Sequence, residues 1–144
     1  MDWKLEVVVV PVTDVDRAKL FYSEKLGFVV DVDQAMGEEF RVVQLTPPGS
    51  GCSITIGKGL STSTPGAYQG LQLVVADIDA AHAELTGRDV EITPVRHMDN
   101  GEWIDGKGGD WNSFFFFSDP DGNGWAVQQS PPWRNGVSGS AGGD

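Results

Sequence analysis

Few side chains in this 144-residue sequence are suited to acid–base, nucleophilic or metal chemistry. His97 precedes a glycine-rich stretch and is the one catalytic candidate, because an imidazole can gain or lose a proton near neutral pH. The other histidine, His82, falls in a predicted helix and is most simply a surface residue. The single cysteine, Cys52, starts a predicted strand, where a free cysteine usually acts as a small apolar side chain. One cysteine also excludes an internal disulfide.

Aromatic residues in the second half of the chain favour binding over catalysis. Four consecutive phenylalanines follow the glycine-rich stretch that contains Trp103. Alternation along a strand sends two of the four to each face of a sheet. We expect one pair to pack beneath a helix, and Phe114 and Phe116 to share a face with Ala126 and Gln128. With Trp103, this second pair either lines a cavity and stacks on a flat ligand or simply fills an interface.

The segment from Met98 to Trp111 has no counterpart in the first half of the chain. It contains four glycines and two tryptophans. Glycine lowers the cost of backbone movement, and tryptophan is costly to leave in water. The segment is therefore either a lid that closes over a ligand or a static loop that packs on the sheet.

Charge and hydropathy exclude several classes of partner. The net charge is −11, with 10 basic and 21 acidic residues, and the basic residues are scattered. Nucleic acids and anionic membranes require basic patches, so we expect neither as a partner. The longest apolar run, Val7 to Val12, is too short to span a bilayer, and the first residues do not resemble a signal peptide. These features predict a cytoplasmic protein.

The chain contains two related halves. Val12–Ala18 and Val75–Ala81 share the end of a strand, an Asp-apolar-Asp motif and the start of a helix. Thr46–Ser50 and Asp119–Asn123 are both Pro-Gly turns between strand-like runs. Two matches in the same order indicate an internal repeat.

Each half is predicted to have the order βαβββ. In the first half the expected elements are strand Leu5–Val12, a helix from Thr13 or Asp14 to Gly27, and strands Phe28–Val32, Phe40–Leu45 and Cys52–Ile56. In the second half they are strand Leu71–Val75, helix Asp77–Leu85 ending at Gly87, and strands Glu91–Val95, Ser113–Phe117 and Gly124–Gln128. The short Pro-Gly turns require antiparallel hairpins.

These elements predict an α+β fold in which two βαβββ modules form a cup-shaped mixed sheet around a pocket. We expect one domain over residues 1–130, with modules at about 5–60 and 68–129, and a flexible tail over 131–144. The hydrophobic sheet edges favour a homodimer. The sequence leaves open whether one chain or the dimer encloses the pocket.

The motif Val12–Ala18, continued by Phe21-Tyr22 and Leu26-Gly27-Phe28, together with Asp119–Asn123, resembles the vicinal oxygen chelate superfamily. This superfamily includes glyoxalase I, extradiol dioxygenases, fosfomycin-resistance enzymes and bleomycin-binding proteins. The resemblance implies paired βαβββ modules around a pocket, in which the enzymes hold a divalent metal with His or Glu side chains. The corresponding positions in this sequence are Val7, Ser53, Gly70 and Ala126. None of these is a normal metal ligand, so we expect no metal and no other cofactor.

The resulting functional prediction is a metal-free protein that binds a hydrophobic or aromatic small molecule, as the sequestering, antibiotic-resistance members do. The alternative is a lyase, isomerase or dioxygenase of the same superfamily with relocated catalytic or metal-binding residues. The predicted pocket residues are Val7, Val9, Ser53, Thr55, Gly70, Gln72, Trp103, Phe114, Phe116, Ala126 and Gln128.

Overall fold

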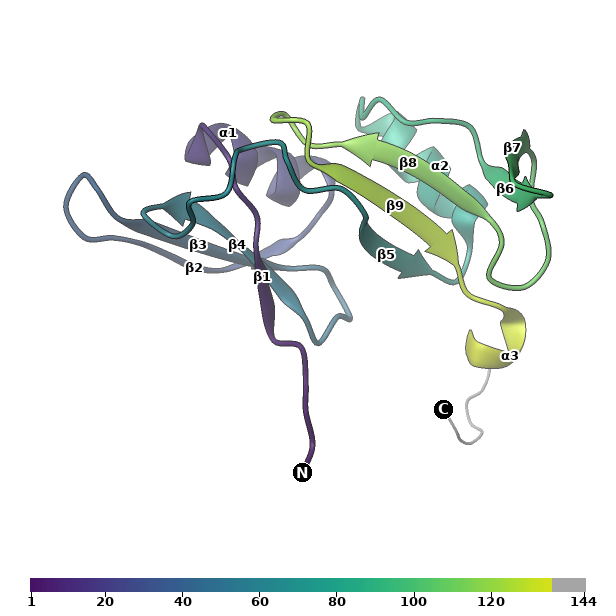
Figure 1. Cartoon of the computed structure of the whole chain (residues 1–144), viewed down its shortest axis with the longest axis horizontal. Helices are drawn as coiled ribbons and strands as arrows, with labels where there is room; N and C mark the ends of the chain where they lie inside the picture. Colours follow the sequence, from purple (N-terminus) through teal and green to yellow (C-terminus); the bar gives the residue numbers. More distant parts are fainter. Residues whose placement is uncertain (136–144) are drawn as a thin grey trace. The chain divides into compact units, whose positions relative to one another are not determined.

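Residues 1–135 of the chain, described by a computed structural model, form two compact units. Unit 1 comprises Met1–Gln69 together with Asp119–Asn123, and unit 2 comprises Gly70–Ser118 together with the described residues from Gly124 onward (Figure 1). The predicted α+β fold of two βαβββ modules is confirmed, with one mixed sheet in each unit. No helix within residues 1–135 is both long and apolar enough to cross a membrane.

Unit 1 contains a four-stranded sheet in the order β1-β4-β3-β2. β1 runs parallel to β4, and the other neighbours are antiparallel. Its elements are β1 (Val7–Val9), α1 (Val15–Leu20), the π-helical turn η1 (Phe21–Lys25), β2 (Val29–Ala35), β3 (Arg41–Thr46) and β4 (Ser53–Lys58). The first strand is shorter than the predicted Leu5–Val12.

The first helix begins as the sequence predicts but does not remain an α-helix. Asp14 caps it by accepting a hydrogen bond of 3.1 Å from the backbone N–H of Arg17. From Phe21 the hydrogen bonds widen to the π-helical spacing, as in the 3.1 Å bond from the Leu26 N–H to the Phe21 carbonyl. Gly27, with φ of 77°, then ends the helix.

One face of the unit 1 sheet packs against α1, and we call it the helix side of the unit. Val43, Leu45 and Ile56 on this face are fully buried. Asp16 of α1 reaches the guanidinium of Arg41, which points to the same side as Val43. The opposite face, which α1 does not cover, is the free face of unit 1.

Unit 2 contains a five-stranded sheet in the order β5-β9-β8-β6-β7, with β5 parallel to β9. Its elements are β5 (Leu71–Val75), α2 (Ile78–Gly87), β6 (Arg96–Asp99), β7 (Glu102–Asp105), β8 (Phe114–Ser118), β9 (Gly124–Gln129) and the short helix α3 (Pro132–Asn135). Asp77 caps α2 through the backbone N–H of Ala80. Phe115 and Val127 face α2 and are buried, which defines the helix side of unit 2, and the opposite face is its free face.

Three predictions for unit 2 need correction. The predicted strand Glu91–Val95 does not form: Pro94 lacks an N–H, and the paired strand begins at Arg96 instead. The segment after Met98 is not an unpaired loop, because β6 and β7 form a hairpin. His82 is not a surface residue, since it is half-buried, 5.3 Å from the Phe115 ring. The predicted flexible tail begins with α3, and residues 136–144 of that tail lie outside the described part of the chain.

Candidate functional site

The free face of unit 1 carries four of the predicted pocket residues. In the parallel pairing of β1 with β4, Val7 lies opposite Ser53 and Val9 opposite Thr55. Ser53 is buried, and its hydroxyl lies 2.6 Å from that of Thr46, which also hydrogen-bonds the Asp31 carboxylate. This face therefore presents a network of hydroxyl groups.

The free face of unit 2 carries six more, of which five are arranged in two rows across β5, β9 and β8. In one row Gln72 pairs with Ala126, which pairs with Phe116. In the next row Val74 pairs with Gln128, which pairs with Phe114. The predicted register, with Phe114 and Phe116 on the face of Ala126 and Gln128, is confirmed.

The sixth residue on this face, Trp103, comes from the β6–β7 hairpin. Its ring packs edge-on against Phe114 and Phe116, with centroid distances of 5.4 and 5.2 Å. The two phenylalanine rings are parallel, 6.2 Å apart. We call these three residues the aromatic cluster. Trp103 is 44% exposed, so the cluster keeps apolar surface open to solvent.

Two glutamine side chains lie beside the aromatic cluster and form a chain of hydrogen bonds. Gln128 donates through Nε2 to the backbone carbonyl of Trp111 over 2.8 Å. Gln72 donates through Nε2 to Oε1 of Gln128 over 2.7 Å. We call this chain the amide relay. It connects the free face of unit 2 to the segment that follows the hairpin.

The segment that contains Trp111, where the relay begins, is held in place by residues of α3. Trp111 has a φ of 61°, a conformation that large side chains rarely adopt. The ring of Trp133 packs edge-on against Trp111, and the Arg134 guanidinium lies 5.3 Å from the Trp111 ring centre. Trp133 in turn donates to the Asp110 carboxylate over 3.0 Å. Nothing in the sequence pattern identified this anchor.

His97, the catalytic candidate, lies away from the aromatic cluster. Within the hairpin Met98 pairs with Trp103, while His97 pairs with Ile104. Alternation therefore directs the His97 side chain to the other side of β6. Its Nδ1 lies 2.9 Å from the carbonyl of Gly106, which engages the imidazole with the local backbone.

The positions at which the enzymes of the resembled superfamily hold a metal do not fit a metal here. Ser53 has the only polar side chain among them, and its hydroxyl is engaged by Thr46. Val7 and Ala126 are apolar, and Gly70, which directly precedes β5, has no side chain. Across residues 1–135, no three His, Cys, Asp or Glu side chains are grouped so that they could hold a metal ion. The half-buried Cys52 thiol lies 3.7 Å from the neighbouring Ser53 carbonyl.

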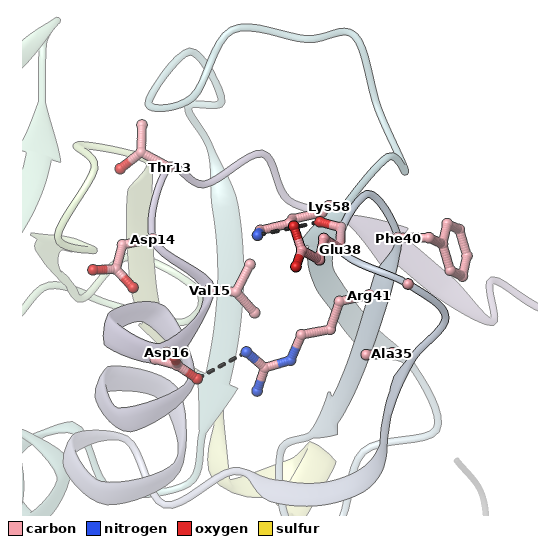
Figure 2. Close-up of a pocket in the computed structure, with 10 residues that line it drawn as sticks. Thr13, Asp14, Val15, Asp16, Ala35, Glu38, Phe40, Arg41 and Lys58 are labelled. Carbon is pink, nitrogen blue, oxygen red and sulfur yellow. Dashed lines mark hydrogen bonds and ion pairs between the residues drawn. The ribbon is translucent and has the colours of Figure 1, made fainter.

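Unit 1 also contains a hollow of about 500 Å³ on its helix side, between the start of α1 and the β2–β3 turn. Arg41 crosses it to reach Asp16 at 2.8 Å, while the Phe40 ring points away (Figure 2). Arg41 also pairs with Asp33 at 3.0 Å, and this guanidinium, followed by the Lys19 ammonium, lowers the pKa of Asp33 to about 2. The same bonds raise the pKa of Arg41. Because its charge is already compensated by two carboxylates, we assign Arg41 a structural role.

Comparison with known proteins identifies the family. Residues 4–127 match the model of the Glyoxalase/Bleomycin resistance protein/Dioxygenase superfamily. The chain is 34% identical to TnmS3, an antibiotic binding protein from Streptomyces sp. CB03234, over 90% of this chain and 97% of that one, with a TM-score of 0.72. It is 35% identical to a glyoxalase/bleomycin resistance protein from the same strain, over 88% of this chain and all of that one, with a TM-score of 0.69.

A third relative is the protein YetH of Bacillus subtilis (strain 168), which is 25% identical over 121 residues, covering 83% of this chain and 92% of that protein. The family match spans most of the chain, and the structural matches cover both βαβββ units. The chain therefore belongs to the glyoxalase/bleomycin resistance protein/dioxygenase superfamily and has the glyoxalase fold.

Proposed function

We propose that this protein binds a hydrophobic, aromatic small molecule without the help of a metal ion, and that it acts by sequestering this molecule. The observation that carries the proposal is the aromatic cluster. Trp103, Phe114 and Phe116 meet on the free face of unit 2 and remain partly exposed. Edge and face contacts with such rings stabilise a flat aromatic ligand beyond simple burial of area.

The surroundings of the cluster support binding rather than turnover. On β5 and β9 the neighbouring side chains are Ala126, Val74 and the two amides of the relay, none of which is an acid, a base or a nucleophile. On β6 and β7, Arg96, which pairs with Phe114, is engaged with the Asp105 carboxylate at 3.4 Å. The metal positions of the superfamily carry residues that are poor ligands. The similarity to TnmS3, an antibiotic binding protein, agrees with this function.

Nile red, a neutral and flat fused-ring dye, is a suitable probe for the first test. We expect saturable binding at one dye per chain, with unchanged affinity after treatment with EDTA. Trp103→Ala should weaken binding by about 1–3 kcal/mol, roughly 5- to 150-fold in Kd, because one large aromatic contact is lost. Fluorescence titration of the dye measures the affinity.

Trp3→Ala is the matched control, because Trp3 is 88% exposed and lies in unit 1. It should leave dye affinity unchanged. Equal affinities of the two variants, or binding that requires an added divalent metal, would overturn the proposal. If Trp103→Ala lowers the melting temperature and leaves affinity intact, the β6–β7 hairpin is structural and does not act as a lid.

A further inference from the structure

The amide relay fixes which end of each glutamine faces which way. The carbonyl of Trp111 can only accept a hydrogen bond, so the Gln128 group within 2.8 Å of it must be the NH₂. Oε1 of Gln128 then faces Gln72 and can only accept, so the nearer group of Gln72 must also be its NH₂. The carbonyl oxygen of Gln72 is left at the end of the relay.

This oxygen is available on the free face of unit 2. Gln72 is an exposed residue of β5, and among residues 1–135 its Oε1 has no hydrogen-bond partner. Across the sheet, Gln72 and Phe116 flank the small side chain of Ala126 in a single row. Neighbouring strands are about 4.8 Å apart, so the row places the glutamine roughly 10 Å from the phenylalanine. A ring system lying over Ala126 can therefore touch Phe116 with one edge and Gln72 with the other.

We propose that the ligand is an aromatic compound with a hydrogen-bond donor on its ring, such as a phenolic hydroxyl or an aryl amine, and that Oε1 of Gln72 accepts from this donor. This inference rests on the proposed function and adds the chemical class of the ligand. Gln72 determines specificity, and Gln128 is a positioning residue that holds the acceptor outward. A ligand with only acceptors at that edge would meet a second acceptor and lose affinity.

The test compares two fused-ring probes by isothermal titration calorimetry: 2-naphthol, which has an O–H donor, and 2-methoxynaphthalene, in which a methyl group replaces the donated hydrogen. We expect 2-naphthol to bind roughly 3- to 10-fold more tightly, the scale of one neutral hydrogen bond. Gln72→Leu should abolish the difference by weakening 2-naphthol alone. Gln128→Leu should reduce the difference, because the Gln72 amide can then rotate and present its NH₂.

Gln129→Leu is the matched control, because Gln129 follows Gln128 in β9 but accepts from the Ile78 N–H on the helix side. It should retain the preference for 2-naphthol even if its melting temperature falls. Equal affinity of both probes for the wild-type protein would overturn this inference and leave the proposed function standing. If neither probe nor Nile red binds, the proposed function itself fails. A preference that survives Gln72→Leu would assign the contact to another residue.

Discussion

Units 1 and 2 share the βαβββ plan, to which unit 2 adds one strand, and they differ most on the faces that their helices do not cover. The helix sides are alike: Val43, Leu45 and Ile56 in unit 1 correspond in role to Phe115 and Val127 in unit 2, and all are buried. The free face of unit 1 carries hydroxyl groups, whereas that of unit 2 carries aromatic rings and amides. Burial against a helix constrains a face to be apolar and closely packed, while the opposite face can change its chemistry without loss of the fold.

The two units also differ in the segment that connects the helix of each unit to its last two strands. Unit 1 connects β2 to β3 by a short turn, while unit 2 places the β6–β7 hairpin before β8. The hairpin contributes Trp103, without which the two phenylalanines of the free face would lack their edge-on partner. The β6–β7 hairpin, which unit 1 lacks, therefore completes the aromatic cluster on the free face of unit 2.

The largest expected effect is a difference in the free energy of unfolding between variants on the two faces of β8. Phe115→Ala should lower the free energy of unfolding by about 3–5 kcal/mol, because this fully buried ring leaves a cavity. Phe114→Ala, one residue away on the half-buried free face, should cost about 1–2 kcal/mol and weaken binding of Nile red. Urea unfolding and dye titration of both variants provide the measurement. Equal losses of stability would show that the two faces are packed alike.

An intermediate effect concerns a buried hydrogen bond of unit 1 that has no equivalent among the described residues of unit 2. The Tyr22 hydroxyl donates to the buried Asp119 carboxylate over 2.7 Å. Tyr22→Phe should therefore cost about 1.5–3 kcal/mol, the range for a hydrogen bond to a charged group. Tyr68→Phe is the control, since no hydrogen bond of the Tyr68 hydroxyl occurs within residues 1–135. A loss for Tyr22→Phe no larger than for this control in urea unfolding would contradict the assigned bond.

The smallest effect compares two ion pairs made by the repeated Asp-apolar-Asp motif. Its second aspartate pairs with Arg41 in unit 1 (Asp16, 2.8 Å) and with Lys107 in unit 2 (Asp79, 2.8 Å). Arg41 also holds the pKa of Asp33 at about 2, below its ordinary value of 3.8. A lowered carboxyl pKa stabilises the fold above pH 4, and this contribution disappears as the pH falls toward 2.

Arg41→Met should accordingly cost up to about 1 kcal/mol at pH 7, because solvent screens this half-buried pair, and much less near pH 2. Lys107→Met should leave the unfolding free energy unchanged at both pH values, since the lysine pair is exposed. Urea unfolding at pH 7 and pH 2 distinguishes the two. A pH-independent loss for Arg41→Met would assign its effect to packing of the aliphatic stem.

The repeat, the caps Asp14 and Asp77 and the register of Phe114 were predictable because each follows from local pattern. The β6–β7 hairpin was missed although it had a signal: Asn100-Gly101, both with positive φ, is the sequence preferred in two-residue hairpin turns. The glycines around it suggested a loop instead. The sequence also placed ten predicted pocket residues on the free faces, six in unit 2 and four in unit 1. The amide relay could not be predicted, because it depends on the direction of the Trp111 carbonyl, which no residue pattern encodes.

The turn Asp119–Asn123 has a consequence for how the protein folds during synthesis. This turn is part of unit 1, although 49 residues of unit 2 (70–118) separate it from Gln69 in the sequence. Within unit 1, the fully buried Asn123 donates to the Pro11 carbonyl over 2.9 Å and accepts from the Tyr68 N–H. When only residues 1–69 of a nascent chain have left the ribosome, Asn123 has not yet been made, and the Pro11 carbonyl and the Tyr68 N–H lack their partner. Unit 1 can therefore complete its interior only after residues 119–123, and with them most of unit 2, have been translated.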